Sequence, residues 1–193
     1  MILGSAISFI RKPPDGGLQA EFIVNHPIEQ ADLTYWKVGE INRLFDAVQK
    51  DYSQNKAGFS ITRGKRIRVI HTWFHRKGKK AITDKIRFMD HPVGMAMLLC
   101  DKGSVNDGLF ITIAVPYFSE KELLRFLNHI KINCGAEGCI VSGDREQQIK
   151  FDPENSKIVW NYAEPWIPKV ASMLEKFSAL SWINPKSQIP NSK

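Results

Sequence analysis

The strongest chemical feature of the chain is a basic segment at residues 56–87. It carries eleven Lys or Arg residues against one acid, Asp84, a net charge of +10, whereas the rest of the 193-residue chain has a net charge of −3. Cations gathered in this way bind polyanions, and a face that only keeps a protein soluble normally mixes both signs of charge. We therefore expect a nucleic-acid-binding surface. Its expected contacts are Arg63, Lys65, Arg66, Arg68, Arg76, Lys77, Lys79 and Lys80.

Residues that could bind a metal or act as nucleophiles are few. Cys134 and Cys139 have a spacing that suits two zinc ligands, but no second pair of Cys or His completes a set. His71 and His75 stand four residues apart without the glutamate of a zinc-protease motif, which favours packing or phosphate contacts. The motifs of serine hydrolases and of phosphate-binding NTP loops do not occur. These residues predict no metal site.

The bulk composition predicts an intracellular protein. Three cysteines cannot all pair with one another, which favours a reducing compartment. No run approaches the roughly 20 apolar residues of a membrane-spanning helix, and residues 1–10 lack the features of a secretory signal. We expect no membrane association and a location in a mitochondrion, a chloroplast or a microbial cytoplasm.

The elements that must position the basic segment follow from periodicity. In the first half we expect a hairpin around the turn at residues 13–17, a long amphipathic helix over 27–52, and a second hairpin of strands 56–62 and 66–71. In the last strand Arg66 and Arg68 alternate with apolar residues, so one face of a sheet would present guanidinium groups. Short helices over 71–87 complete this half. The aromatic residues Trp36, Trp73 and Phe74 are expected in the core.

The second half opens with a proline-initiated apolar helix. Pro92 suits the first helical turn, and Asp101 to Ser104 end the helix. Ser119 and Glu122 form a capping box that begins another helix. The remaining expected elements are a strand at 109–115, a hairpin of 138–142 with 147–151, and a final helix over 163–180.

Corresponding apolar segments with small residues stand at the start of each half. They are ILGSAI at residues 2–7 and AMLLCDKGS at residues 96–104. Three further segments keep the same order around the second motif, namely YWK at 35–37, KKAI at 79–82 and FSEKE at 118–122. Together these segments resemble the monomeric LAGLIDADG homing endonucleases over almost the whole chain.

This resemblance implies an α+β fold of two αββαββ-like halves with pseudo-twofold symmetry. The paired antiparallel sheets of that family form a saddle that clasps the DNA major groove. The halves would span residues 1–90, which hold the basic segment, and residues 91–182, with a tail at 183–193. A monomer with internal pseudo-symmetry is expected.

In that family each motif helix ends in an acid before a glycine, and the two carboxylates hold divalent metals that cleave phosphodiesters. The resemblance places these positions at Phe9 and Lys102. A phenyl ring has no lone pair for Mg²⁺, and an ammonium group repels it. Asp101 is the nearest replacement, although one residue along a helix is a rotation of about 100°; Asp15 is another. We expect no catalytic residues and no cofactor, with Mg²⁺ required only if cleavage is retained.

Lys102 has two interpretations. It contacts a phosphate where the metals would bind, or it is a solvated lysine that the helix dipole stabilises.

The expected function is nucleic-acid binding with cleavage activity lost. The partner is DNA or structured RNA, so an RNA-binding intron maturase and a structural ribonucleoprotein component, for example of an organellar ribosome, are alternatives. An active metal-dependent endonuclease or nickase is a third. The sequence does not choose among them.

Overall fold

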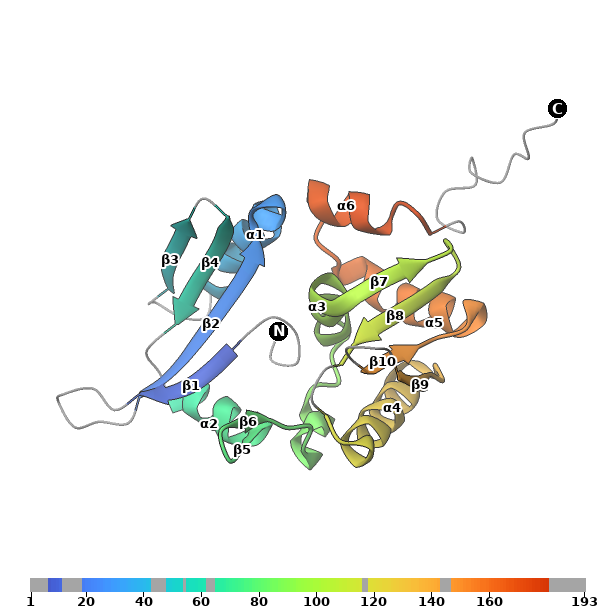
Figure 1. Ribbon diagram of the computed structural model, residues 1–193, viewed down its shortest axis with the longest axis horizontal. Helices are drawn as coiled ribbons and strands as arrows, with labels where there is room; N and C mark the ends of the chain where they lie inside the picture. The colour runs from blue at the N-terminus through green and yellow to red at the C-terminus, as the bar shows by residue number, and fades with distance from the viewer. Residues whose placement is uncertain are drawn as a thin grey trace. The chain divides into compact units, whose positions relative to one another are not determined.

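The computed structural model describes residues 7–11, 19–42, 48–53, 55–61, 65–115, 118–142 and 147–180. The chain divides into two compact units, Met1–Met89 and Asp90–Lys193 (Figure 1).

The first unit is a four-stranded antiparallel sheet covered by helices. Its strand order is β1-β2-β4-β3, and every neighbouring pair is antiparallel. A two-stranded hairpin, β5–β6, and a short 3₁₀ helix, η2, follow the sheet. The elements are β1 (Ile7–Arg11), β2 (Gln19–Pro27), η1 (Ile28–Gln30), α1 (Ala31–Asn42), β3 (Val48–Ser53), β4 (Lys56–Ile61), α2 (Lys65–Phe74), β5 (His75–Arg76), β6 (Lys79–Lys80) and η2 (Asp84–Phe88).

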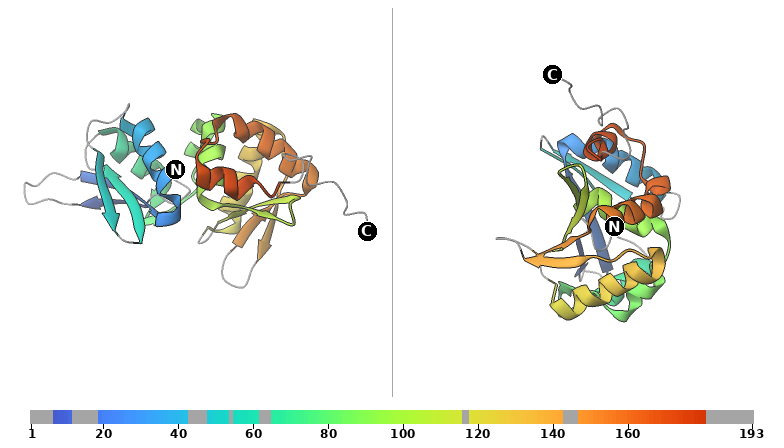
Figure 2. Two further views of the ribbon diagram at one scale, coloured as in Figure 1. Left: turned by 90° about the horizontal axis from the view of Figure 1, so that it is seen from above. Right: turned by 90° about the vertical axis from the view of Figure 1, so that its right-hand side faces the viewer.

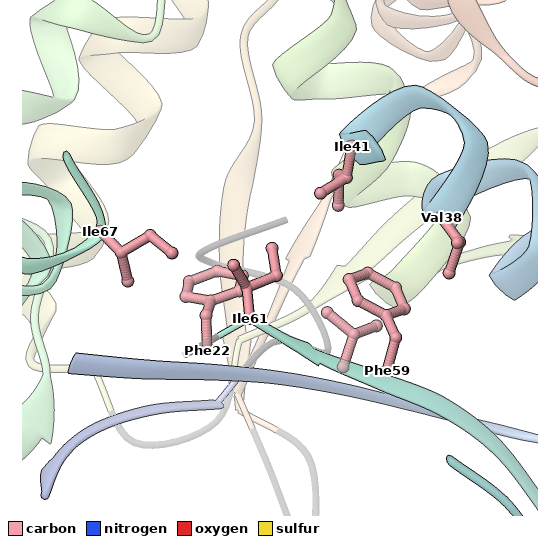
Figure 3. Packing of buried hydrophobic residues seen from close by; sticks show 7 residues of the cluster. Phe22, Val38, Ile41, Phe59, Ile61 and Ile67 are labelled. Carbon is pink, nitrogen blue, oxygen red and sulfur yellow. The ribbon is translucent and has the colours of Figure 1, made fainter. Parts of the chain in front are cut away.

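The core of this unit lies between one face of its sheet and helices α1 and α2 (Figures 2 and 3). Alternate residues of β2 and β4 point into it, since side chains of a strand alternate between faces. The buried cluster consists of Phe22, Val24, Val38, Ile41, Phe59, Ile61 and Ile67. The intervening residues of β2 and β4 therefore occupy the face opposite to the two helices.

The second unit repeats the arrangement. Its sheet has the order β7-β8-β10-β9, again antiparallel throughout. Helices α3 and α5 contact each other and β8. The elements are α3 (Pro92–Lys102), β7 (Gly103–Asn106), β8 (Phe110–Ala114), α4 (Glu120–Cys134), β9 (Cys139–Ser142), β10 (Gln147–Lys150), α5 (Pro153–Ala163), η3 (Glu164–Trp166) and α6 (Ala171–Phe177).

Local signals explain where several of these helices begin and end. Pro92 occupies the first turn of α3, as predicted. The capping box is confirmed: the amide and hydroxyl of Ser119 donate to Glu122 Oε2 at 3.0 and 2.6 Å. Gly135, with φ of 81°, ends α4 in the left-handed conformation that glycine tolerates best.

The α+β fold class with two like halves is confirmed, because both sheets have equivalent strand orders. Four predicted features are correct: the hairpin around 13–17, helix α3, strand β8 and the β9–β10 hairpin. Phe74 is buried as expected, whereas Trp36 and Trp73 are half-buried. No described helix has the length and apolar character that a membrane span requires.

Three predicted elements are wrong. The long helix of 27–52 ends at Asn42, and Val48–Ser53 is strand β3. The second hairpin is formed by β3 and β4, while residues 66–71 belong to helix α2. The final helix predicted over 163–180 is broken: α5 ends at Ala163, and the segment holds the short η3 and then α6, which ends at Phe177. The expected tail after residue 182 and the opening segment before Ile7 lie outside the described residues.

Candidate nucleic-acid interface

Helix α3 passes directly into strand β7 at Gly103. A Cβ at this position would lie 2.6 Å from the carbonyl oxygen of Leu99 and 2.9 Å from its Cα, distances that real side chains do not show. The Gly103 amide donates to that same carbonyl. Glycine is therefore required for the strand to leave the helix without a loop. As a result Lys102 is the last residue of α3, and Asp101 immediately precedes it.

A second lysine reaches the same helix end. Lys176 of α6 donates from Nζ to the carbonyl oxygens of Leu99 and Cys100, at 3.1 and 2.7 Å. These carbonyls lie at the negative end of the helix dipole, which a cation stabilises. The C-terminus of α3 thus carries the ammonium groups of Lys102 and Lys176 beside the carboxylate of Asp101. Sequence patterns gave no sign of Lys176, because it lies on another helix.

The position assigned to Phe9 needs correction. Phe9 lies inside strand β1, opposite Glu21 of β2, and not at the end of a helix. Residues 1–14 contain no Asp or Glu, so the sequence around Phe9 offers no carboxylate in its place. The first acid of the chain, Asp15, lies outside the described residues.

The residues at the end of α3 do not fit a divalent-cation site. Mg²⁺ binds oxygen ligands, carboxylates above all, whereas this end presents two ammonium groups and one carboxylate. Among the described residues no group of three or more His, Cys, Asp or Glu could hold a metal. Cys134 and Cys139 are free thiols whose Sγ atoms donate to the carbonyls of Ile130 and Lys150.

The basic segment of residues 56–87 spans strand β4, helix α2, the β5–β6 hairpin and the 3₁₀ helix η2. The predicted strand with alternating Arg66 and Arg68 is wrong, since both belong to α2, which packs on the side of the sheet that holds the core. Arg68 is exposed. Lys65 also belongs to α2, whereas Arg63 lies outside the described residues. Within unit 1 the sheet does not present these arginines.

The β5–β6 hairpin concentrates four of the predicted contacts. Arg76 pairs with Lys79 across the strands, and both are exposed. Lys77 and Gly78 connect the strands with φ of 50° and 75°, which is the signature of a tight two-residue hairpin turn. Lys77 is exposed and Lys80 is half-buried. The turn holds the backbone of this cationic tip in one conformation.

His75, the first residue of β5, stacks on His71 of α2. Their ring centroids lie 4.1 Å apart with an interplanar angle of 11°, and Nδ1 of His75 lies 3.1 Å from the carbonyl oxygen of His71. Burial lowers the pKa of His71 from its ordinary value. Burial also lowers the pKa of His75, helped by the neighbouring His71 and Lys80. Both rings are therefore mainly neutral at pH 7, and their contact is one of packing.

The sheet of unit 2 has a polar face that the sequence analysis missed. On the side away from the buried isoleucines of β8, Thr112 Oγ1 lies 2.6 Å from Ser104 Oγ and accepts from Asn106 Nδ2 at 2.9 Å. Lys150 Nζ lies 4.4 Å from the ring centroid of Phe110. Thr112 itself is buried, whereas Ser104, Asn106 and Lys150 are exposed. Their hydroxyl, amide and ammonium groups can bind base edges and phosphates. The alternation of Ile111, Thr112 and Ile113 in β8 was the sequence signal from which this polar face could have been predicted.

Comparisons with known proteins agree with this architecture. The model of the LAGLIDADG DNA endonuclease family matches residues 1–159. Among solved structures, the homing endonuclease I-WcaI bound to its DNA recognition sequence is similar at 15% identity and a TM-score of 0.69, over 91% of this chain and 81% of that chain.

Two other solved structures show the same fold. I-DmoI in complex with DNA and Mn has 13% identity and a TM-score of 0.57, over 84% of this chain and 90% of that one. The LAGLIDADG meganuclease I-AabMI bound to uncleaved DNA has 9% identity and a TM-score of 0.56, over 96% and 90%. No curated protein sequence matches. The extent of the family match and the repeated sheets together establish that this chain belongs to the LAGLIDADG DNA endonuclease family.

Proposed function

We propose that this chain binds nucleic acid on a LAGLIDADG scaffold without cleaving it. The observation that carries the proposal is the end of α3, where Lys102 precedes Gly103 and Lys176 bonds to the last carbonyls of the helix. Metal-dependent hydrolysis of a phosphodiester needs carboxylates that hold the divalent cations. Ammonium groups attract the phosphate backbone but cannot hold such cations.

The distribution of charge supports retained binding. Residues 56–87 carry a net charge of +10, and their side chains include the exposed Arg68, Arg76, Lys77 and Lys79. Cation contacts to phosphates supply most of the sequence-independent affinity of nucleic-acid-binding proteins. Binding can therefore persist in a protein that has no hydrolytic site.

The proposal separates into a binding test and a cleavage test. Crosslinking in the native cell, followed by sequencing of the bound nucleic acid, identifies the partner as a DNA target, an intron RNA or a ribosomal RNA. Enrichment of an intron would favour a maturase, and enrichment of ribosomal RNA would favour a ribonucleoprotein subunit. Failure to recover any nucleic acid above a charge-matched control protein contradicts the binding claim.

The competing function is residual endonuclease or nickase activity, which Asp101 favours as the acid at the end of α3. The test incubates the protein with supercoiled plasmid libraries and Mg²⁺ or Mn²⁺. We expect no nicking above the level of the Asp101→Asn variant. Metal-dependent cuts that disappear in Asp101→Asn would show that cleavage is retained.

A further inference from the structure

An exposed aromatic pair lies within the basic segment of unit 1. Phe88, the last residue of η2, is 53% exposed, and its ring stacks on the half-buried Trp73 of α2. The ring centroids lie 5.3 Å apart with an interplanar angle of 28°. Within η2, Ile86 is 3% exposed and supplies the apolar contact with the core, whereas the ring of Phe88 is left half in solvent.

Two cations stand close to the Phe88 ring. The guanidinium carbon of Arg87 lies 5.0 Å from the ring centroid, and Nζ of Lys85 lies 5.7 Å from it. Both distances fall within the range of cation–π contact. Arg87 is exposed, so its guanidinium remains accessible to a ligand. The exposed ring of Phe88 and the positive charges of Lys85 and Arg87 therefore lie at one place on the surface of unit 1.

The backbone below the pair is anchored. Thr83 donates from Oγ1 to the carbonyl oxygen of Trp73 at 2.6 Å. The Oγ1 atom of Thr83 also accepts from the amide of Lys85, at the start of η2, at 3.3 Å. Ile86, which stands between Lys85 and Arg87 in the sequence, is buried in the core. Because η2 is tied to α2 at the residue that bears the second ring, the two rings are held together before any ligand arrives.

From these contacts we infer that Trp73 and Phe88 form a stacking platform for an unpaired base of single-stranded nucleic acid, with Arg87 and Lys85 binding the adjacent phosphates. Bases within a duplex already stack on both faces, so an aromatic platform selects a base that has left the helix. This inference rests on the proposed nucleic-acid binding and extends it from charge attraction to a defined site for a single strand.

The affinity test compares a labelled single strand of about 10 nucleotides, as DNA and as RNA, with a duplex of the same sequence. Phe88→Leu keeps apolar contact with Trp73 but removes the aromatic face. We expect it to weaken single-strand binding by roughly 5- to 150-fold, as the loss of one stacked base does, and to change duplex binding by less than about 2-fold. Phe88→Trp should preserve affinity, and Ile132→Ala, at an apolar residue 73% exposed in unit 2, is the matched control.

A direct readout is photocrosslinking of a single strand that contains 5-iodouridine. Modification is expected on the tryptic peptides of residues 88–102 and 69–76, which contain Phe88 and Trp73. Crosslinks confined to other peptides, or equal losses of single-strand and duplex affinity in Phe88→Leu, overturn the platform while leaving the proposed function intact. If the unaltered protein binds neither form, both proposals fail.

Discussion

Reversing the charge at the tip of the β5–β6 hairpin should reduce the salt dependence of nucleic-acid binding. The perturbation is the double variant Arg76→Glu and Lys79→Glu. These residues are exposed and face each other across the hairpin, and their backbone is held by the turn at Lys77 and Gly78. The substitutions lie outside the buried core, so the fold of unit 1 should persist.

The magnitude follows from the spacing of the pair. Residues directly opposite in an antiparallel pair have Cβ atoms about 4.5–5.5 Å apart, so Arg76 and Lys79 can reach one or two phosphates of one strand. Each lost phosphate contact removes about 0.9 from the slope of log Kobs against log salt on duplex DNA. The slope should therefore fall by about 0.9 to 1.8. Between 50 and 200 mM salt the loss of affinity would be smaller by a factor of about 3 to 12.

The assay is fluorescence anisotropy with a labelled duplex over a salt series. The control variant, Lys121→Glu with Lys157→Glu, makes the same change in net charge on α4 and α5 of unit 2. It should lower affinity only weakly and leave the slope almost unchanged. An unaltered slope in the hairpin variant, or an equal decrease in the control, would refute the reasoning that the hairpin contacts phosphates.

Three further outcomes are expected. Gly103→Ala should lower the free energy of unfolding by about 1–3 kcal/mol in urea titrations, because its Cβ would overlap the carbonyl of Leu99. Lys176→Met should destabilise unit 2 by about 1–3 kcal/mol in the same measurement, since two charge-assisted bonds to the end of α3 are lost; Lys176→Arg should retain part of them. Burial lowers the pKa of His71 and His75, so the unfolded state binds more protons than the folded state and the free energy of unfolding should fall as the pH drops below about 6.5; the double His→Phe variant should lose this dependence.

Local signals in the sequence were sufficient for several elements. The capping box of Ser119 and Glu122, and Pro92 at the first turn of α3, act through backbone groups within a few residues. The same kind of signal begins α5, where Asp152 accepts from the amide of Asn155, yet this helix was not predicted. The concentration of charge in residues 56–87 is likewise a property of the sequence alone.

The alternation of basic and apolar residues over 66–69 is too short to distinguish a strand from a helix. In α2 the buried residues Ile67, His71 and Phe74 follow helical spacing, whereas Val69 is 44% exposed and does not join the core. Both patterns fit the short run around Arg68. Packing of Ile67 against β2 and β4 selects the helix, and this choice moves the arginines away from the strand that was expected to present them.

The sequence by itself determined the family resemblance, the local excess of positive charge and the absence of acids before Asp15. Only the tertiary structure decided that Lys176 reaches the carbonyl of Leu99, a residue 77 positions away, and that Phe88 stacks on Trp73. The physical reason is range. Capping, turn geometry and charge depend on neighbours in the chain, whereas these contacts depend on which helices and strands bury their apolar faces together.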